Sequence, residues 1–257
     1  MLIDSHAHLD MDDFDADRDD VIERAVNGGV TRVVTIGVDL ASSIKAIEIA
    51  KKYHFIYATV GYHPHNADGV DAGDLEKLRA LVSDPKVVAW GEIGLDFFRR
   101  HSPPEKQVKA FERQLDIASE QSLPVIIHDR DAHADLVRIL KSRKRQYRGV
   151  IHCFSGNYSL AMTLIEMGFS ISFPGTVTYK NAAAAQEVAG RIPLERLLVE
   201  TDCPYLTPEP LRGRRNEPLY VRHTAEKIAQ LRQMDFKELA HATSANAVRL
   251  FNLPETP

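Results

Sequence analysis

The sequence predicts an α/β fold, a single distorted (β/α)8 TIM barrel with extra C-terminal helices, over residues 1–257. Short runs rich in β-branched residues alternate with amphipathic helical patterns along the whole chain. Eight strand candidates match the number that closes a parallel barrel. No glycine-rich dinucleotide-binding loop follows the first candidate, which argues against an open doubly wound sheet.

The predicted strands share a short apolar run and a polar loop at their C-terminal end. Such runs are typical of strands that alternate with helices in a parallel sheet. The eight strands are Leu2–Ser5, Thr31–Ile36, Ile56–Val60, Val87–Glu92, Val125–His128, Gly149–His152, Phe169–Phe173 and Leu197–Glu200.

Helical patterns lie between these strands and after the last one. The run Ser102-Pro103-Pro104-Glu105 predicts a helix start, with a capping box and with proline at the first helical position. Asp235 is predicted to open the final helix. The apolar stripes of four helices are Leu40, Ile44 and Ile47; Val108, Phe111, Leu115 and Ala118; Val221, Ala225 and Ile228; and Phe236, Leu239, Thr243 and Leu250.

The composition excludes several classes of protein. A hydrophobic content of 44%, a charged content of 26% and a net charge of -4 describe an ordinary globular protein without a broad basic surface for nucleic acid. A small phosphate-binding site remains compatible with this charge. No secretory pattern or membrane-length apolar run is visible, so we expect a cytoplasmic protein with no membrane association. Cys153 and Cys203 are then expected to be free thiols.

Polar side chains gather at the C-terminal ends of the predicted strands. His6 and His8 are two positions apart, so on a strand they point to the same side. In a β/α barrel these strand ends converge on one face, which carries the active site. Four imidazoles and two carboxylates exceed the ligand set of one zinc ion and suit two cations that share a carboxylate. The residues are His6, His8, Glu92, His128, His152 and Asp202.

Each of these residues taken alone also has a structural explanation, such as a buried histidine bonded to a carbonyl group or an aspartate that caps a turn. Glu200 precedes Asp202 by two positions, and Asp4 stands in the same relation to His6. Both acids are expected either to orient a ligand or to be buried structural carboxylates. His63 is a candidate phosphate contact or leaving-group acid, or a turn histidine ahead of Pro64.

At these motifs the chain resembles the TatD family of metal-dependent hydrolases, within the amidohydrolase-like superfamily. The motifs occur in family order along the chain, and one departure is Cys203, where many relatives have serine. The matching segments are Asp4-Ser5-His6-Ala7-His8-Leu9, Gly61-Tyr62-His63-Pro64, Gly91-Glu92-Ile93-Gly94-Leu95-Asp96, His128-Asp129-Arg130-Asp131-Ala132, His152-Cys153-Phe154-Ser155-Gly156, Glu200-Thr201-Asp202-Cys203-Pro204-Tyr205-Leu206 and Arg214-Arg215-Asn216-Glu217-Pro218.

The resemblance implies a site with two divalent cations and hydrolysis of ester bonds, usually as a deoxyribonuclease. It places His6, His8 and Asp202 at one metal, His128 and His152 at the other, and Glu92 between them. The nucleophile is then a metal-bound hydroxide. The ligand types leave zinc, magnesium, manganese and iron open.

Asp202 is the candidate base, and Glu92 is counted with it as a catalytic residue. His63, Arg130 and Arg214 are the candidate substrate-binding residues. We expect a DNA 3′ end or a small phosphoester as substrate, and no obligate protein partner. Basic residues predicted on the active face are Arg99, Arg100, Arg212, Arg214 and Arg215, and those predicted on the opposite face are Lys141, Arg143, Lys144, Arg145 and Arg148.

Two alternative functions stay open at this point. The same barrel and metals support hydrolysis of an amide, a lactone or an aminoacyl ester, because the fold does not decide the bond. A more remote hypothesis is a binding protein without enzymatic activity on an inherited barrel. The presence of all six ligand positions argues against this last hypothesis.

Overall fold

The computed structural model describes residues 1–143 and 146–254. Within these residues eight parallel strands form one sheet in the order β1 to β8, so the predicted barrel is confirmed. The strands are β1 (Leu2–Ala7), β2 (Val30–Thr35), β3 (Ile56–Val60), β4 (Val87–Asp96), β5 (Val125–Arg130), β6 (Gly149–Ile151), β7 (Phe169–Phe173) and β8 (Leu197–Val199).

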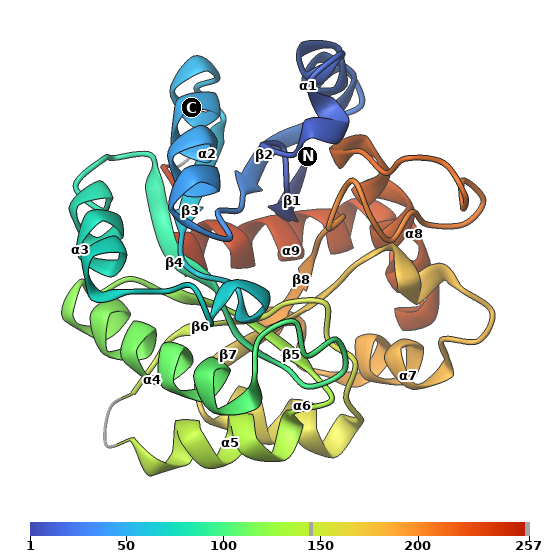
Figure 1. Cartoon of the computed structure of the whole chain (residues 1–257). Coiled ribbons are helices and arrows are strands. Elements are labelled where there is room, and N and C mark those ends of the chain that lie inside the picture. The colour runs from blue at the N-terminus through green and yellow to red at the C-terminus, as the bar shows by residue number, and fades with distance from the viewer. Residues whose placement is uncertain (144–145, 255–257) are drawn as a thin grey trace.

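The helices surround this central group of strands, as Figure 1 shows. Helix α8 follows β8 as the eighth barrel helix, and α9 is an additional helix that packs against β1 and β8. No helix in residues 1–143 or 146–254 is long and apolar enough to cross a membrane. The helices are α1 (Arg18–Asn27), α2 (Leu40–Lys52), α3 (Ala72–Leu81), α4 (Pro104–Glu120), α5 (His133–Ser142), α6 (Tyr158–Glu166), α7 (Ala183–Arg191), α8 (Val221–Arg232) and α9 (Phe236–Phe251).

The barrel closes between β1 and the residues that follow β8. Ala7 forms an isolated parallel bridge with Cys203. The backbone N–H of Asp202 donates to the carbonyl of His6 at 2.9 Å, and the N–H of His8 donates to the carbonyl of Cys203 at 2.9 Å. This seam places Asp202 next to the two histidines of the first strand.

The floor of the barrel is apolar beneath the C-terminal strand ends. Ile126, Val150 and Leu198 are buried in one core cluster, which Leu250 and Phe251 of α9 complete. Side chains two positions apart on a strand point to the same side. His128, His152 and Glu200, each two residues further along, therefore lie above this floor.

The fourth strand is longer than the sequence predicts. It was expected to end at Glu92, but it continues to Asp96 and pairs with β5 through Gly94 and His128. A Cβ atom on Gly94 would lie 2.0 Å from the carbonyl oxygen of His128, so only glycine permits this close pairing. The other strand boundaries shift by one or two residues from their expected positions.

The predicted capping box before α4 is wrong. The helix does start at Pro104, but its N-cap is Pro103 and no side chain caps it. The Ser102 hydroxyl instead donates to the carbonyl of His65 at 2.8 Å and accepts from the N–H of Asp68 at 3.0 Å. The long β3–α3 loop therefore uses the hydroxyl that the local pattern assigned to the helix.

Candidate metal centre

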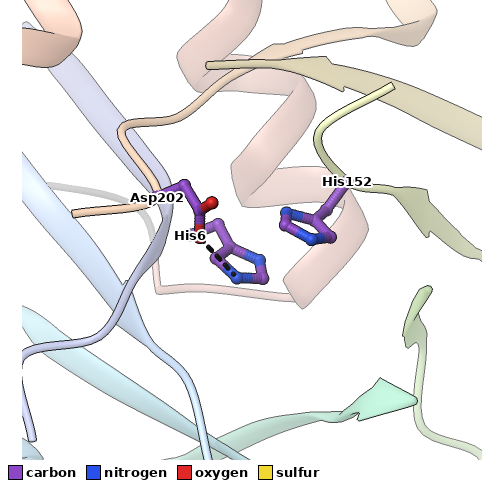
Figure 2. A group of neighbouring side chains, drawn as sticks. All are labelled: His6, His152 and Asp202. Carbon is purple, nitrogen blue, oxygen red and sulfur yellow. Dashed lines mark ion pairs between the residues drawn. The ribbon is translucent and has the colours of Figure 1, made fainter. Parts of the chain in front are cut away.

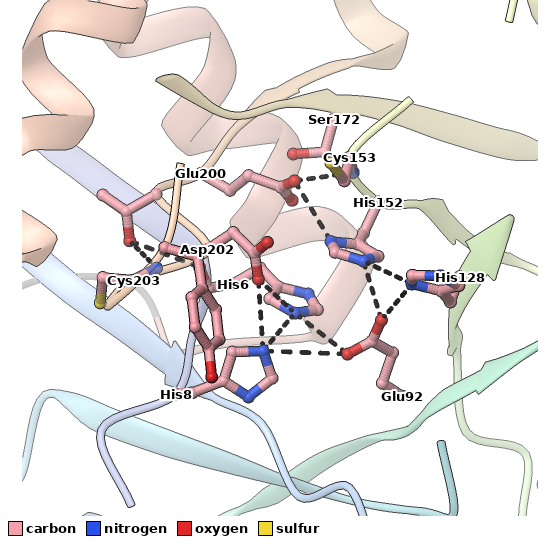
Figure 3. A network of polar contacts seen from close by, with 12 residues as sticks. His6, His8, Glu92, His128, His152, Cys153, Ser172, Glu200, Asp202 and Cys203 are labelled. Atoms are coloured by element: carbon pink, nitrogen blue, oxygen red, sulfur yellow. Dashed lines mark hydrogen bonds and ion pairs between the residues drawn. The ribbon is translucent and has the colours of Figure 1, made fainter. Parts of the chain in front are cut away.

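The six residues expected to bind metal come together at the C-terminal end of the barrel (Figure 3). They reach one point because each lies in or just after a different strand, apart from the two histidines that share β1 and its end. His6 lies in β1 and His8 follows it, Glu92 lies in β4, His128 lies in β5, His152 follows β6, and Asp202 follows β8.

Glu92 lies in the middle of the cluster and is buried. One of its oxygens, Oε1, is 2.8 Å from His128 Nδ1 and 2.8 Å from His152 Nε2. The other, Oε2, is 3.4 Å from His6 Nε2 and 3.9 Å from His8 Nε2. The two oxygens of one carboxylate thus face two different pairs of imidazoles.

Asp202 lies on the side of His6 and His8. Its Oδ1 is 3.2 Å from His8 Nε2 and 3.6 Å from His6 Nε2. Figure 2 shows Asp202 with His6 and His152, whose rings stack with centroids 3.8 Å apart. Asp202 has a φ of 57°, in the left-handed region that most residues avoid. The backbone is held in this conformation where the carboxylate meets the histidines.

The electrostatics of the cluster favour a carboxylate and neutral imidazoles. Burial alone would raise the pKa of Glu92, but the imidazoles of His152, His63 and His6 hold that pKa well below its usual value. Burial lowers the pKa of the His63 imidazole to about 4. Glu92 is therefore ionised and His63 is neutral at neutral pH.

The donor atoms fit divalent cations. Three groups have ligand atoms that lie within 4.8 Å of one another. His6 Nδ1 and His8 Nδ1 are buried and find no hydrogen-bond partner in the described residues. Imidazole nitrogens with carboxylate oxygens are a donor set for zinc, manganese or iron. The three groups are His6, His8 and Glu92; His6, His152 and Asp202; and His63, Glu92 and His128.

His63 lies closer to the metal-binding groups than the sequence indicates. Its Nε2 is 3.4 Å from Glu92 Oε1, and its ring centroid is 4.6 Å from that of His128. The expectation of a turn histidine is also met, because its Nδ1 accepts the N–H of His65 at 3.0 Å. One ring can serve both purposes, since its two nitrogens point to different partners.

The two neighbouring acids have different tasks. Glu200 Oε1 accepts the N–H of Cys153 at 2.7 Å and lies 3.3 Å from His152 Nδ1, so it orients that ring. Asp4 does not contact the ring of His6. It accepts from the N–H and hydroxyl of Thr201 at 2.9 and 2.6 Å, and burial raises its pKa to about 8. Asp4 thus fastens β1 to the segment that carries Asp202.

Asp96 is a contributor to the centre that the sequence analysis did not assign. Its Oδ2 is 3.3 Å from His128 Nε2 and 2.8 Å from His65 Nε2. The ring of His128 is thereby oriented from the side away from Glu92, as histidine ligands usually are. The available signal was spacing, because Asp96 lies four positions after Glu92 on the same strand.

Two buried glutamines of α4 were also missed. Gln107 Oε1 accepts the N–H of Asp96 at 2.8 Å, and its Nε2 donates to the Asp96 carbonyl at 3.0 Å. Gln114 Oε1 accepts the N–H of Tyr62 at 2.8 Å, and its Nε2 donates to the Tyr62 carbonyl at 2.9 Å. The two amides are seven positions apart on the apolar side of the helix, which is the signal that could have found them.

Gln114→Leu is expected to lower the free energy of unfolding by about 2 kcal/mol, because both backbone groups of Tyr62 lose their partners inside the protein. Chemical denaturation followed by fluorescence measures this change. Gln230→Leu, at an exposed position of α8, is the matched control and should change stability by less than about 0.5 kcal/mol. Equal effects of the two substitutions would contradict a latching role for Gln114.

The candidate substrate arginines differ in their freedom. Arg130 is exposed and its guanidinium lies 4.0 Å from the centroid of the Phe98 ring, and Arg214 is exposed. Arg215 pairs with Asp17 at 2.6 and 2.9 Å. On the opposite face Arg143 pairs with Asp116, and the predicted Lys144 and Arg145 lie outside the described residues.

Comparison with known proteins decides the family. The sequence model of a family described as TatD related DNase matches residues 3–252. The chain belongs to the TatD family. The resemblance noted in the sequence is therefore confirmed.

Relatives of this TatD protein match it over almost their whole length. An uncharacterized metal-dependent hydrolase, YabD of Bacillus subtilis, is 46% identical over 98% of this chain and 100% of the relative. A 3'-5' ssDNA/RNA exonuclease, TatD of Citrobacter rodentium, is 39% identical over 98% of both chains. The crystal structure of the TatD homologue YjjV of Escherichia coli has a TM-score of 0.93 at 32% identity, over 98% of both chains. The chain is a metal-dependent hydrolase.

Proposed function

We propose that this chain is a phosphodiesterase that removes nucleotides from the 3′ end of single-stranded DNA with the help of two divalent cations. The observation that carries the proposal is the position of Glu92, whose two oxygens face separate pairs of imidazoles. A relative from Citrobacter rodentium that bears the name of a 3'-5' ssDNA/RNA exonuclease supports the choice of substrate. The cytoplasmic location and the absence of an obligate protein partner stay predictions.

The ligands divide into two sets that share Glu92. His6, His8 and Asp202 would hold one cation, since their facing atoms lie on the Oε2 side of Glu92. His128 and His152 would hold the other on the Oε1 side, with His63 beside them. Zinc, manganese and iron suit this imidazole-rich set better than magnesium does.

Bound cations would lower the pKa of a water molecule and neutralise charge on the phosphoryl oxygens. Asp202 is the proposed proton acceptor, because its side chain is 14% exposed whereas that of Glu92 is 3% exposed. An entering water can therefore reach Asp202 more easily than Glu92. His63, as a neutral imidazole, can bind a cation or accept a hydrogen bond. Arg130 and Arg214 are proposed to contact the DNA backbone at the rim.

The test is release of nucleotides from a labelled single-stranded oligonucleotide. Magnesium, manganese and zinc are added separately, and EDTA should stop the reaction. Bis-p-nitrophenyl phosphate, carboxyl esters and cyclic amides are assayed in parallel. Absence of oligonucleotide cleavage by protein shown to carry metal would contradict the nuclease proposal, and hydrolysis of an amide, lactone or ester would then identify the alternative.

A further inference from the structure

A pocket of about 590 Å³ lies beside the metal centre on the same face of the barrel. It is formed where the chain leaves β2, β3 and β4, so its position follows from the same strand ends that carry the site. Its volume is within the range of small-molecule sites. The lining includes Leu40, Ala41, Ile44, His65, Asn66 and His101.

The lining offers flat and apolar surfaces with a polar edge. Leu40, Ala41 and Ile44 come from the first two turns of α2, and Ile44 is 42% exposed. The imidazoles of His65 and His101 meet edge to face, with centroids 4.6 Å apart. Ring systems that stack and also form hydrogen bonds at their edge suit such a surface.

The charge of the pocket selects against phosphate. In the described residues its lining contains the carboxylates of Asp39 and Asp68 and no lysine or arginine. Asp68 has a basic neighbour outside the lining, Lys106, at 3.6 Å. Carboxylates repel a phosphate but accept hydrogen bonds from amino and imino groups. An uncharged heterocycle with N–H donors fits better than the sugar–phosphate backbone.

The pocket is joined to the metal centre through His65. Its Nε2 is 2.8 Å from Asp96 Oδ2, and the same oxygen is 3.3 Å from His128 Nε2. The ring centroids of His65 and His128 are 6.1 Å apart. A phosphate at the metal centre and a base in the pocket would thus be separated by about one sugar.

We propose that this pocket binds the base of the 3′-terminal nucleotide while the metal centre holds the phosphodiester that is cut. This inference rests on the proposed nuclease function and adds the determinant of substrate position. The arginines at the rim then contact the backbone, and the pocket between α2 and the β3–α3 loop contacts the base.

The experiment compares Ile44→Ser with Val26→Ser, a matched loss of an exposed apolar side chain on α1, where Val26 is 45% exposed. Three substrates are used: a single-stranded oligonucleotide, the same oligonucleotide with an abasic 3′-terminal nucleotide, and bis-p-nitrophenyl phosphate. The ratio of kcat/KM for the oligonucleotide to that for bis-p-nitrophenyl phosphate should fall about tenfold in Ile44→Ser, mainly through KM. It should not change in Val26→Ser.

The abasic substrate supplies the second readout. The wild-type protein should cleave it with a higher KM than the normal oligonucleotide, and Ile44→Ser should not raise that KM further. An equal loss on normal and abasic ends, or no loss on either, would overturn the base pocket while leaving the nuclease intact. A wild-type protein that cleaves no oligonucleotide would overturn both the proposed function and the pocket.

Discussion

Glu92→Ala should abolish metal-dependent hydrolysis, with a loss in kcat/KM on the order of a thousandfold or more. The reason is that one buried carboxylate faces both sets of imidazoles, so its removal affects both proposed metal positions at once. Several buried imidazoles also lose the negative charge beside them. Elemental analysis of metal content and hydrolysis of a labelled oligonucleotide measure the two effects.

Glu48→Ala is the control for this substitution, because Glu48 is exposed on α2. It should keep both metal and activity. Thermal unfolding of both variants separates loss of the centre from loss of the fold. A Glu92→Ala protein that retains its metal and cleaves at the wild-type rate would remove Glu92 from the proposed mechanism.

Asp202→Asn should lower kcat by about 10²–10⁴-fold, which is the contribution expected from a general base. The amide has nearly the same shape as the carboxylate but cannot take up the proton. Asparagine also tolerates the left-handed backbone at this position, where φ is 57°. The fold should therefore survive, and metal content should fall less than in Glu92→Ala.

The matched control is Asp131→Asn, the same change at an exposed aspartate whose φ is 54°. Steady-state kinetics on the oligonucleotide compares the two variants, with saturating metal to compensate for weaker binding. If kcat of Asp202→Asn stays within about threefold of wild type, the general-base assignment fails by the magnitude argument above.

The barrel could be predicted because its signals are local. Each strand is a short apolar run, and each helix shows an apolar stripe, so neither depends on distant residues. The prediction that polar strand ends meet follows from the geometry of any closed parallel sheet. His6 and His8 are the clearest case, since their Nε2 atoms lie 3.3 Å apart.

Alternation along the strand fails at Glu92, and only the tertiary structure corrects it. Counting by two places Glu92 on the same side of β4 as Trp90. Trp90 instead packs toward α4, where its Nε1 donates to Gln114 at 3.2 Å, while Glu92 points into the barrel. The register between β4 and β5 shifts between Trp90 and Ile93, and Gly91 has a φ of 155°. This irregularity turns Glu92 toward the metal centre.

The sequence by itself determined the strand order, the family and the residue types at the strand ends, because these depend on local pattern and motif. The tertiary structure decided which atoms face each other. The latch of Gln114 on Tyr62, the contact of Asp96 with His128, and the seam that sets Asp202 beside His6 all join distant segments. Their hydrogen bonds depend on distances that arise only when the barrel closes, so no local pattern contains them.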